Sequence, residues 1–83
     1  MKFVFSQHAL DQIKIRGISK ETVLAIVFEP DSIVDEDETI RIYSKLVNND
    51  SKIYLYRVFV NYLKQPCIII TVYKTSKIKK YGN

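Results

Sequence analysis

The chain has 83 residues, of which 47% are hydrophobic and 27% charged, so it is long enough for one small domain and too apolar to be disordered. Its single cysteine, Cys67, excludes an internal disulfide and a cysteine metal cluster. No stretch approaches the roughly 20 apolar residues that span a bilayer, and the N-terminus lacks a signal-peptide pattern. We therefore expect one cytoplasmic domain over residues 1–83, with no membrane contact.

The charge is divided unevenly along the chain. Residues 1–50 carry six basic and nine acidic side chains, a balance of −3, whereas residues 51–83 carry seven basic and no acidic side chains, a balance of +7. Together they give the net charge of +4. A half-chain without carboxylates suits a polyanion or an acidic protein partner, although a tail that only aids solubility has the same composition.

Two helices are predicted before Pro30. Ser6 is a suitable N-cap and Gly17 a suitable left-handed C-cap, so the first helix spans about residues 7–16. Ser19 caps a second helix, which is apolar around much of its circumference and which Pro30 ends. Such a helix is expected to be buried, between a sheet and the first helix.

After the second helix, the hydrophobic period changes from helical to two, which is typical of strands. The predicted strands are Ile33-Val34, Thr39–Val47, Lys52–Tyr62 and Cys67–Tyr73. An acidic turn at 35–38 and turns at 48–50 and 64–66 connect them. The last strand is apolar on both faces and is therefore expected to be central. This order predicts an α+β fold, with two N-terminal helices packed on a three- to four-stranded antiparallel meander and a short extended lead-in before them.

The only histidine, His8, begins a polar stripe on the first predicted helix. Gln12 and Arg16 follow it at steps of four, a spacing that stacks the three side chains along one face. Histidine takes and gives a proton near neutral pH, and arginine holds a phosphate with two hydrogen bonds. The stripe fits half of a metal-free phosphoryl-transfer site, and it also fits a solvated helix face.

The last predicted strand ends in hydroxyl and ammonium groups. The polar residues there are Thr71, Tyr73, Lys74, Thr75, Ser76, Lys77, Lys79 and Lys80. Within the strand, Lys74 points to the face opposite Thr71 and Tyr73, whereas the residues after the strand can bend back toward it. Such donors suit a phosphate without a metal, and the final two lysines add general attraction for phosphate. A solvated C-terminal segment is the other interpretation.

These groups together fit metal-free cleavage of RNA. A base removes the proton of the 2′-hydroxyl, the oxygen attacks phosphorus, and an acid protonates the leaving 5′-oxygen. His8 fits either proton-transfer role, and Arg16 and the strand-end groups fit a phosphate cradle. The arrangement requires the first helix to lie beside the last strand. There is no glycine-rich phosphate loop, HExxH motif or Cys/His metal spacing, so neither a cofactor nor a metal is expected.

Both ends of the chain resemble a family of small bacterial domains with the approximate signature H-A-x-x-R-x-x-x-R-G-I-S. The matching segments are Phe5–Ala9, Arg16–Ser19, Glu29–Asp31 and Thr71–Ile78. The likeness covers nearly the whole chain and is vaguest over residues 35–65. That family is similar to the BrnT and RelE toxins and to the wider barnase–EndoU–colicin–RelE fold group. The first arginine of the signature is Gln12 here, which removes a charge from the helix stripe.

The resemblance implies a RelE/BrnT-like, metal-independent endoribonuclease, often the toxin of a toxin–antitoxin pair, whose basic face an acidic antitoxin covers. The catalytic positions that it implies are His8, Arg16, Thr71, Tyr73 and Lys77. The residues expected to bind RNA beside them are Gln12, Lys74, Ser76, Lys79 and Lys80. The alternative is a non-catalytic module of the same fold that binds RNA or an acidic protein, and the missing arginine at position 12 favours it. A small structural or regulatory domain is the third interpretation.

Overall fold

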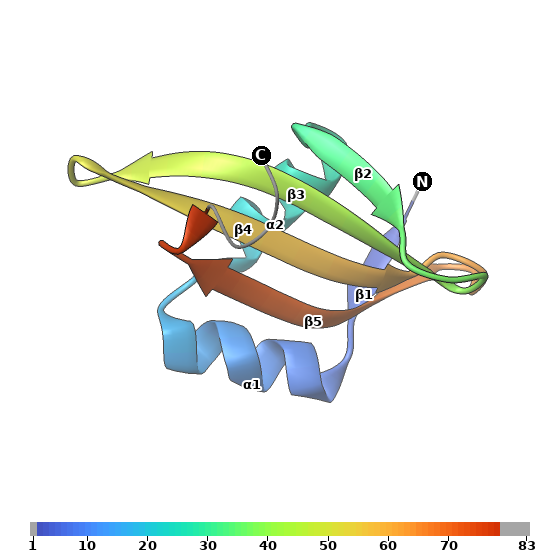
Figure 1. Ribbon diagram of the computed structural model, residues 1–83. Coiled ribbons are helices and arrows are strands. Elements are labelled where there is room, and N and C mark those ends of the chain that lie inside the picture. The colour runs from blue at the N-terminus through green and yellow to red at the C-terminus, as the bar shows by residue number, and fades with distance from the viewer. Residues whose placement is uncertain (1, 79–83) are drawn as a thin grey trace.

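The computed structural model describes residues 2–78 and contains two helices and five strands (Figure 1). In chain order the elements are β1 (Phe3–Phe5), α1 (Gln7–Arg16), α2 (Lys20–Phe28), β2 (Ser32–Asp35), β3 (Ile40–Asn49), β4 (Lys52–Asn61) and β5 (Cys67–Thr75). The expected α+β class with two N-terminal helices is confirmed. Neither helix has the length and apolar character that crossing a membrane requires.

The sheet differs from the expected meander in strand number and in one pairing. Its order is β1-β5-β4-β3-β2; the pairs from β2 to β5 are antiparallel, whereas β1 runs parallel to β5. The prediction of three to four antiparallel strands was therefore wrong in both respects. The physical reason is long-range, because the three residues Phe3–Phe5 find their partner in Cys67–Ile69 near the other end of the chain. No local pattern reports such a pairing.

Local caps set the helix boundaries. The Ser6 hydroxyl accepts a hydrogen bond from the Ala9 N–H at 3.1 Å, and Gly17 ends α1 with a φ of 67°, where a side chain would be strained. The Ser19 hydroxyl accepts from the Thr22 N–H at 3.0 Å at the start of α2. Because the caps depend only on neighbouring residues, the predicted span of the first helix is confirmed.

α1 lies along the edge of β5 that the short β1 leaves open (Figure 1). Ser6 donates its N–H to the Ile69 carbonyl at 2.9 Å and its hydroxyl to the Ile70 carbonyl at 3.1 Å. Further along α1, the side-chain oxygen Oε1 of Gln12 accepts the Val72 N–H at 3.0 Å. Ser6 and Gln12 thus provide hydrogen-bond partners for backbone groups of β5 that would otherwise pair with another strand. These bonds hold α1 along the edge of the sheet.

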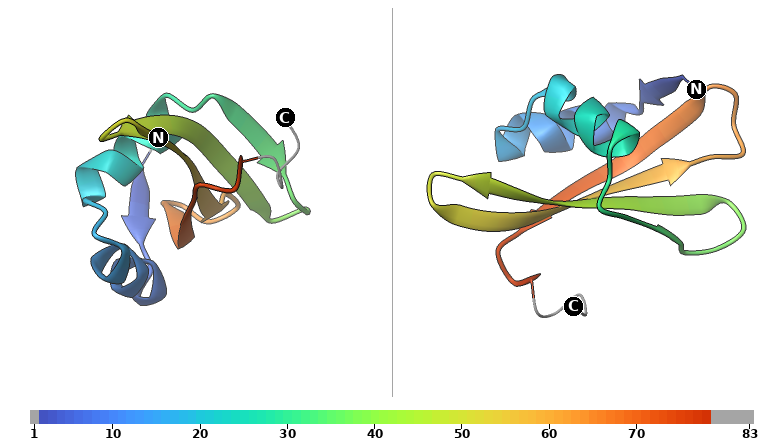
Figure 2. Two further views of the ribbon diagram at one scale, coloured as in Figure 1. Left: turned by 60° about the vertical axis from the view of Figure 1, so that its left-hand side comes forward. Right: turned by 90° about the horizontal axis from the view of Figure 1, so that it is seen from above.

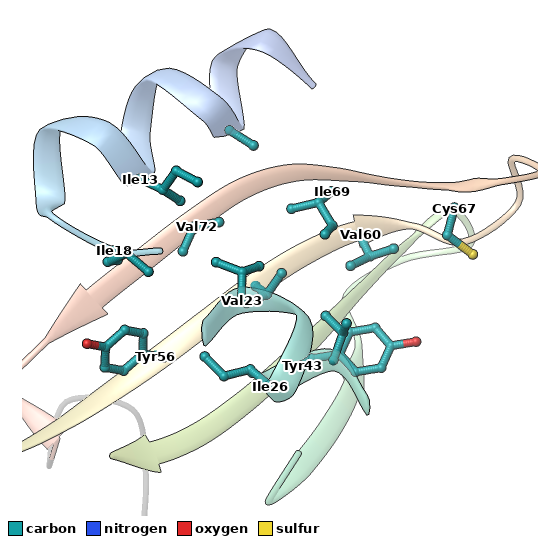
Figure 3. Packing of buried hydrophobic residues seen from close by; sticks show 13 residues of the cluster. Ile13, Ile18, Val23, Ile26, Tyr43, Tyr56, Val60, Cys67, Ile69 and Val72 are labelled. Carbon is teal, nitrogen blue, oxygen red and sulfur yellow. The ribbon is translucent and has the colours of Figure 1, made fainter. Parts of the chain in front are cut away.

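Both helices lie on one side of the sheet, and residues 76–78, which follow β5, pass to the other side (Figure 2). A buried apolar cluster joins the helices to the sheet (Figure 3). Its members are Ala9, Ile13, Ile18, Val23, Ile26, Val27, Tyr43, Tyr56, Val58, Val60, Cys67, Ile69 and Val72. Cys67 is buried there, as its apolar neighbours in sequence predict.

A β-bulge in β5 determines which face its later residues occupy. Val60 pairs with Ile69 but Phe59 pairs with Thr71, so Ile70 is an extra residue. Before the bulge Ile69 points into the core, and after it Val72 does, although the two are three residues apart. Strict alternation from Ile69 would place Thr71 in the core and expose Val72. The bulge instead turns Thr71, and every second residue after it, away from the helices.

The acidic turn between β2 and β3 is organised by one carboxylate. Asp37 Oδ1 accepts hydrogen bonds from the Thr39 N–H at 2.7 Å, the Ile40 N–H at 2.8 Å and the Thr39 hydroxyl at 3.0 Å. The Thr39 backbone bond, followed by the Ile40 backbone bond and the Thr39 hydroxyl, lowers the pKa of the Asp37 carboxyl. The expected solvated turn at 35–38 is exposed, and Asp37 fixes its path into β3.

We expect the wild type to be more stable than Asp37→Ala, with a difference in the free energy of unfolding that is largest at neutral pH and shrinks on acidification. Because the folded pKa of Asp37 lies below the ordinary 3.8, its stabilisation is present above that value and is lost as the pH falls through the lower folded value. Thermal denaturation at several pH values down to about 2 measures the difference. A difference that stays constant over this range would contradict the role of the carboxylate charge.

We expect Gln12→Ala to lower the free energy of unfolding by about 1–3 kcal/mol, because the partly buried Val72 N–H loses its acceptor. Gln12→Glu keeps an acceptor oxygen and should cost less. Chemical denaturation measures both variants, and amide exchange should quicken at Val72 in Gln12→Ala. The control is Gln7→Ala, which removes only an exposed bond to Asp11. Wild-type stability in Gln12→Ala would show that this side chain does not hold the edge.

Candidate functional site

Three cationic side chains gather at the C-terminal end of β5. They belong to a shallow pocket of about 370 Å³, here called the basic pocket, which is lined by Arg16, Tyr54, Lys74, Thr75, Ser76 and Lys77. Arg16 is the last residue of α1, Tyr54 lies in β4, and the other four residues end β5 or follow it. No carboxylate is among these residues, so the pocket has a positive potential that suits an anion.

Aromatic rings hold two of the cations in place. The ammonium Nζ of Lys74 lies 4.6 Å from the centroid of the Tyr54 ring and 5.8 Å from that of Tyr56. The guanidinium carbon of Arg16 lies 5.3 Å from the centroid of Tyr73. Such contacts orient a cation without neutralising it. Within residues 2–78, no carboxylate forms an ion pair with Arg16 or Lys74.

Thr75 forms the turn that brings Lys77 to the pocket. Its side-chain oxygen Oγ1 accepts the Lys77 N–H at 3.0 Å, and Thr75 itself is buried. Ser76 lies exposed between them. The chain thus bends directly after β5, and two hydroxyl-bearing residues stand between Lys74 and Lys77.

The structure brings some of the predicted site residues together and leaves others apart. Those that line the basic pocket are Arg16, Lys74, Ser76 and Lys77. Tyr73 lies beside the pocket through its contact with Arg16. Thr71 is on the same face of β5 as Tyr73, opposite the helices, and does not line the pocket. Lys79 and Lys80 lie outside the described residues.

His8 and Gln12 occupy other surroundings. His8 is exposed in the first turn of α1, eight residues before Arg16, which is about 12 Å along a helix with a rise of 1.5 Å per residue. It does not line the basic pocket. Gln12 faces the edge of β5, where its oxygen holds the Val72 N–H. The first helix does lie beside the last strand, but the three side chains of the stripe do not meet at one point.

Tyr54 is the pocket residue that sequence reasoning missed. The alternating pattern of β4 assigns Tyr54 to a face of the strand but gives no sign of a site. The missing information is the strand register, in which Leu55 pairs with Thr75 and thereby brings Tyr54 level with the turn after β5. The density of tyrosines and lysines in the basic half of the sequence is the one signal that could have pointed to it.

A second groove, of about 320 Å³, lies on the sheet face opposite the helices. It is lined by Asp31, Ser32, Val34, Ser44, Lys45, Leu46, Leu55, Arg57 and Ile78. Lys45 there donates to the Glu29 carbonyl at 2.8 Å and lies 3.8 Å from an Asp31 carboxylate oxygen. Because a carboxylate offsets this cation and several of the lining residues are apolar, the groove is a poorer anion site than the basic pocket.

Comparison with known proteins gave no matching family model, no matching curated protein and no matching solved structure. Within residues 2–78, no group of three or more His, Cys, Asp or Glu side chains is placed to hold a metal ion.

Proposed function

We propose that this protein is a metal-independent endoribonuclease of RelE/BrnT-like fold that holds RNA phosphate in the basic pocket. The observation that carries the proposal is the convergence of Arg16, Lys74 and Lys77, together with three hydroxyl-bearing residues, in one pocket without a carboxylate. Phosphate oxygens are bound in proteins by this combination of cations and hydroxyl or backbone donors. We place the reaction in the cytoplasm, where RNA is available and a free thiol such as Cys67 stays reduced.

The proposed reaction is attack of a 2′-hydroxyl oxygen on the adjacent phosphorus. A base takes the hydroxyl proton, the new O–P bond forms, and the bond to the 5′-oxygen breaks as an acid gives that oxygen a proton. Arg16 and Lys77 offset the negative charge that builds on the phosphate oxygens. The Tyr73 phenol beside Arg16 is a candidate for one proton transfer. His8 lies about 12 Å from Arg16 along α1, so it takes the other only when the bound RNA places the scissile phosphate between the two side chains.

The proposed role as a toxin includes an acidic antitoxin as the protein partner. Residues 51–83 contain seven basic and no acidic side chains, and they supply five of the six residues of the basic pocket. An acidic segment laid over this surface would occupy the phosphate site and block RNA. Inhibition by such a partner then follows from charge complementarity, without any change in the fold.

A second candidate function is a module that binds RNA or an acidic protein without turnover. Two observations favour it: His8 lies outside the basic pocket, and Gln12 is used to hold β5. This candidate shares the pocket with the enzyme and differs from it only in chemistry. Measuring cleavage and binding separately therefore distinguishes the two.

We expect the purified protein to cleave RNA in the presence of EDTA, and His8→Ala to lose roughly 10²- to 10⁴-fold in rate, the usual contribution of general acid–base catalysis. His8 is exposed, so the substitution should leave stability unchanged. Gln7→Ala, one residue away and also exposed, is the matched control. Full activity of His8→Ala would remove His8 from the mechanism, and binding without cleavage by the wild type would favour the non-catalytic module.

We expect affinity for RNA to fall with salt. Lys77→Ala or Arg16→Ala should reduce the slope of log affinity against log salt by about 0.7 for each phosphate that the variant no longer neutralises. The probe is 2′-O-methyl RNA, which lacks the attacking hydroxyl and so reports binding alone. Lys64→Ala removes an exposed lysine at the other end of β4 and should leave the slope unchanged. If an acidic polypeptide binds and RNA does not, the partner is a protein.

A further inference from the structure

Tyr54 stands at the border between the apolar core and the basic pocket. It is half-buried, packs against the core cluster and is one of the six residues that line the pocket. Lys74 Nζ lies 4.6 Å and Lys52 Nζ lies 5.8 Å from the centroid of its ring. An aromatic ring in a solvent-open pocket, flanked by ammonium groups, has the composition of a nucleobase platform.

Lys74 connects the ring to the phosphate site. Its ammonium belongs to the pocket and also lies over Tyr54, so a phosphate bonded to Lys74 at about 2.8 Å stands next to that ring. The phosphate draws the ammonium toward its oxygens and leaves ring surface for the base of the same nucleotide. Phosphate and base are thus recognised by adjacent groups on β5 and β4.

We infer that Tyr54 stacks on an unpaired base of single-stranded RNA whose phosphate occupies the basic pocket, and this inference rests on the RNA binding proposed above. Stacking requires a base with a free face, which single strands offer and duplexes withhold because their bases stack on one another. The basic pocket alone attracts either form of RNA. Tyr54 is therefore the residue that makes the protein prefer a single strand.

Tyr62 provides a matched control on the same segment of chain. It too is half-buried against the core cluster and has a cation over its ring, with the Arg41 guanidinium carbon 4.2 Å from the centroid. That arginine is paired with Asp35 at 2.8 Å, and Tyr62 lies beyond the opposite end of β4, away from the basic pocket. Tyr62→Leu therefore tests the loss of a similar ring away from the proposed phosphate site.

The experiment measures the affinity of Tyr54→Leu, Tyr54→Phe and Tyr62→Leu for 2′-O-methyl RNA, single-stranded and duplex, over a series of salt concentrations. We expect Tyr54→Leu to bind the single strand on the order of tenfold more weakly with an unchanged salt slope, because stacking releases no counterions. Tyr54→Phe and Tyr62→Leu should bind it like the wild type. None of the three should change affinity for the duplex.

A 2-aminopurine base in the single strand gives a second readout that a loss of stability would not imitate. Its fluorescence should be quenched on binding to the wild type and to Tyr54→Phe, but not when saturated with Tyr54→Leu. Wild-type affinity and quenching in Tyr54→Leu, or an equal loss for single strand and duplex, would overturn the inference. If Lys77→Ala still weakens RNA binding in that case, the proposed phosphate site is supported and only the stacking role of Tyr54 is contradicted. If the wild type binds no RNA, both proposals are contradicted.

Discussion

The contact between α1 and the open edge of β5 determines where the rest of the candidate site lies. β1 covers only the first three residues of β5, and the backbone groups beyond them need other partners. The Ser6 hydroxyl bonds the Ile70 carbonyl at 3.1 Å and Gln12 bonds the Val72 N–H at 3.0 Å, while the Ser6 N–H bonds the carbonyl of Ile69, the last residue that β1 covers, at 2.9 Å. Because α1 is fixed at its start and in its middle, its last residue, Arg16, is carried to the end of β5. A helix held at one point only would leave that guanidinium free to swing away from the pocket.

The bulge at Ile70 is the second constraint. The helix contact determines where α1 lies along β5, whereas the bulge determines which face of the sheet each later residue of β5 points to. By turning Val72 into the core, it also turns Lys74 to the helix side of the sheet, where the rings of Tyr54 and Tyr56 lie. Tyr73 is directed to the other side, within reach of Arg16 at the sheet edge. The pocket thus draws on residues from both faces of one strand, which is feasible only where the strand has an open edge and is about to end.

Features that depend on neighbouring residues could be predicted from the sequence. Ser6, Ser19 and Gly17 define the helix ends because caps and left-handed turns depend only on nearby residues. The absence of carboxylates from the second part of the chain made the lysines at the end of the last strand candidates for an anion site. The parallel pairing of β1, the bulge and the place of Tyr54 could not be predicted, since each depends on strand register. The separation of His8 from Arg16 illustrates the same limit: a period of four residues places side chains on one stripe, but neighbouring elements determine what each one meets.

The acidic turn between β2 and β3 and the C-terminal end of β5 lie at opposite ends of the sheet (Figure 1), and the basic pocket is at the end of β5. Such a separation gives the molecule a permanent electric dipole directed along its strands. At a distance of about one Debye length, the field of a polyanion would bias the protein toward orientations in which the end of β5 faces it. This bias favours productive first contacts, so the charges at 35–38 are expected to raise the rate of association although they lie far from the proposed binding surface.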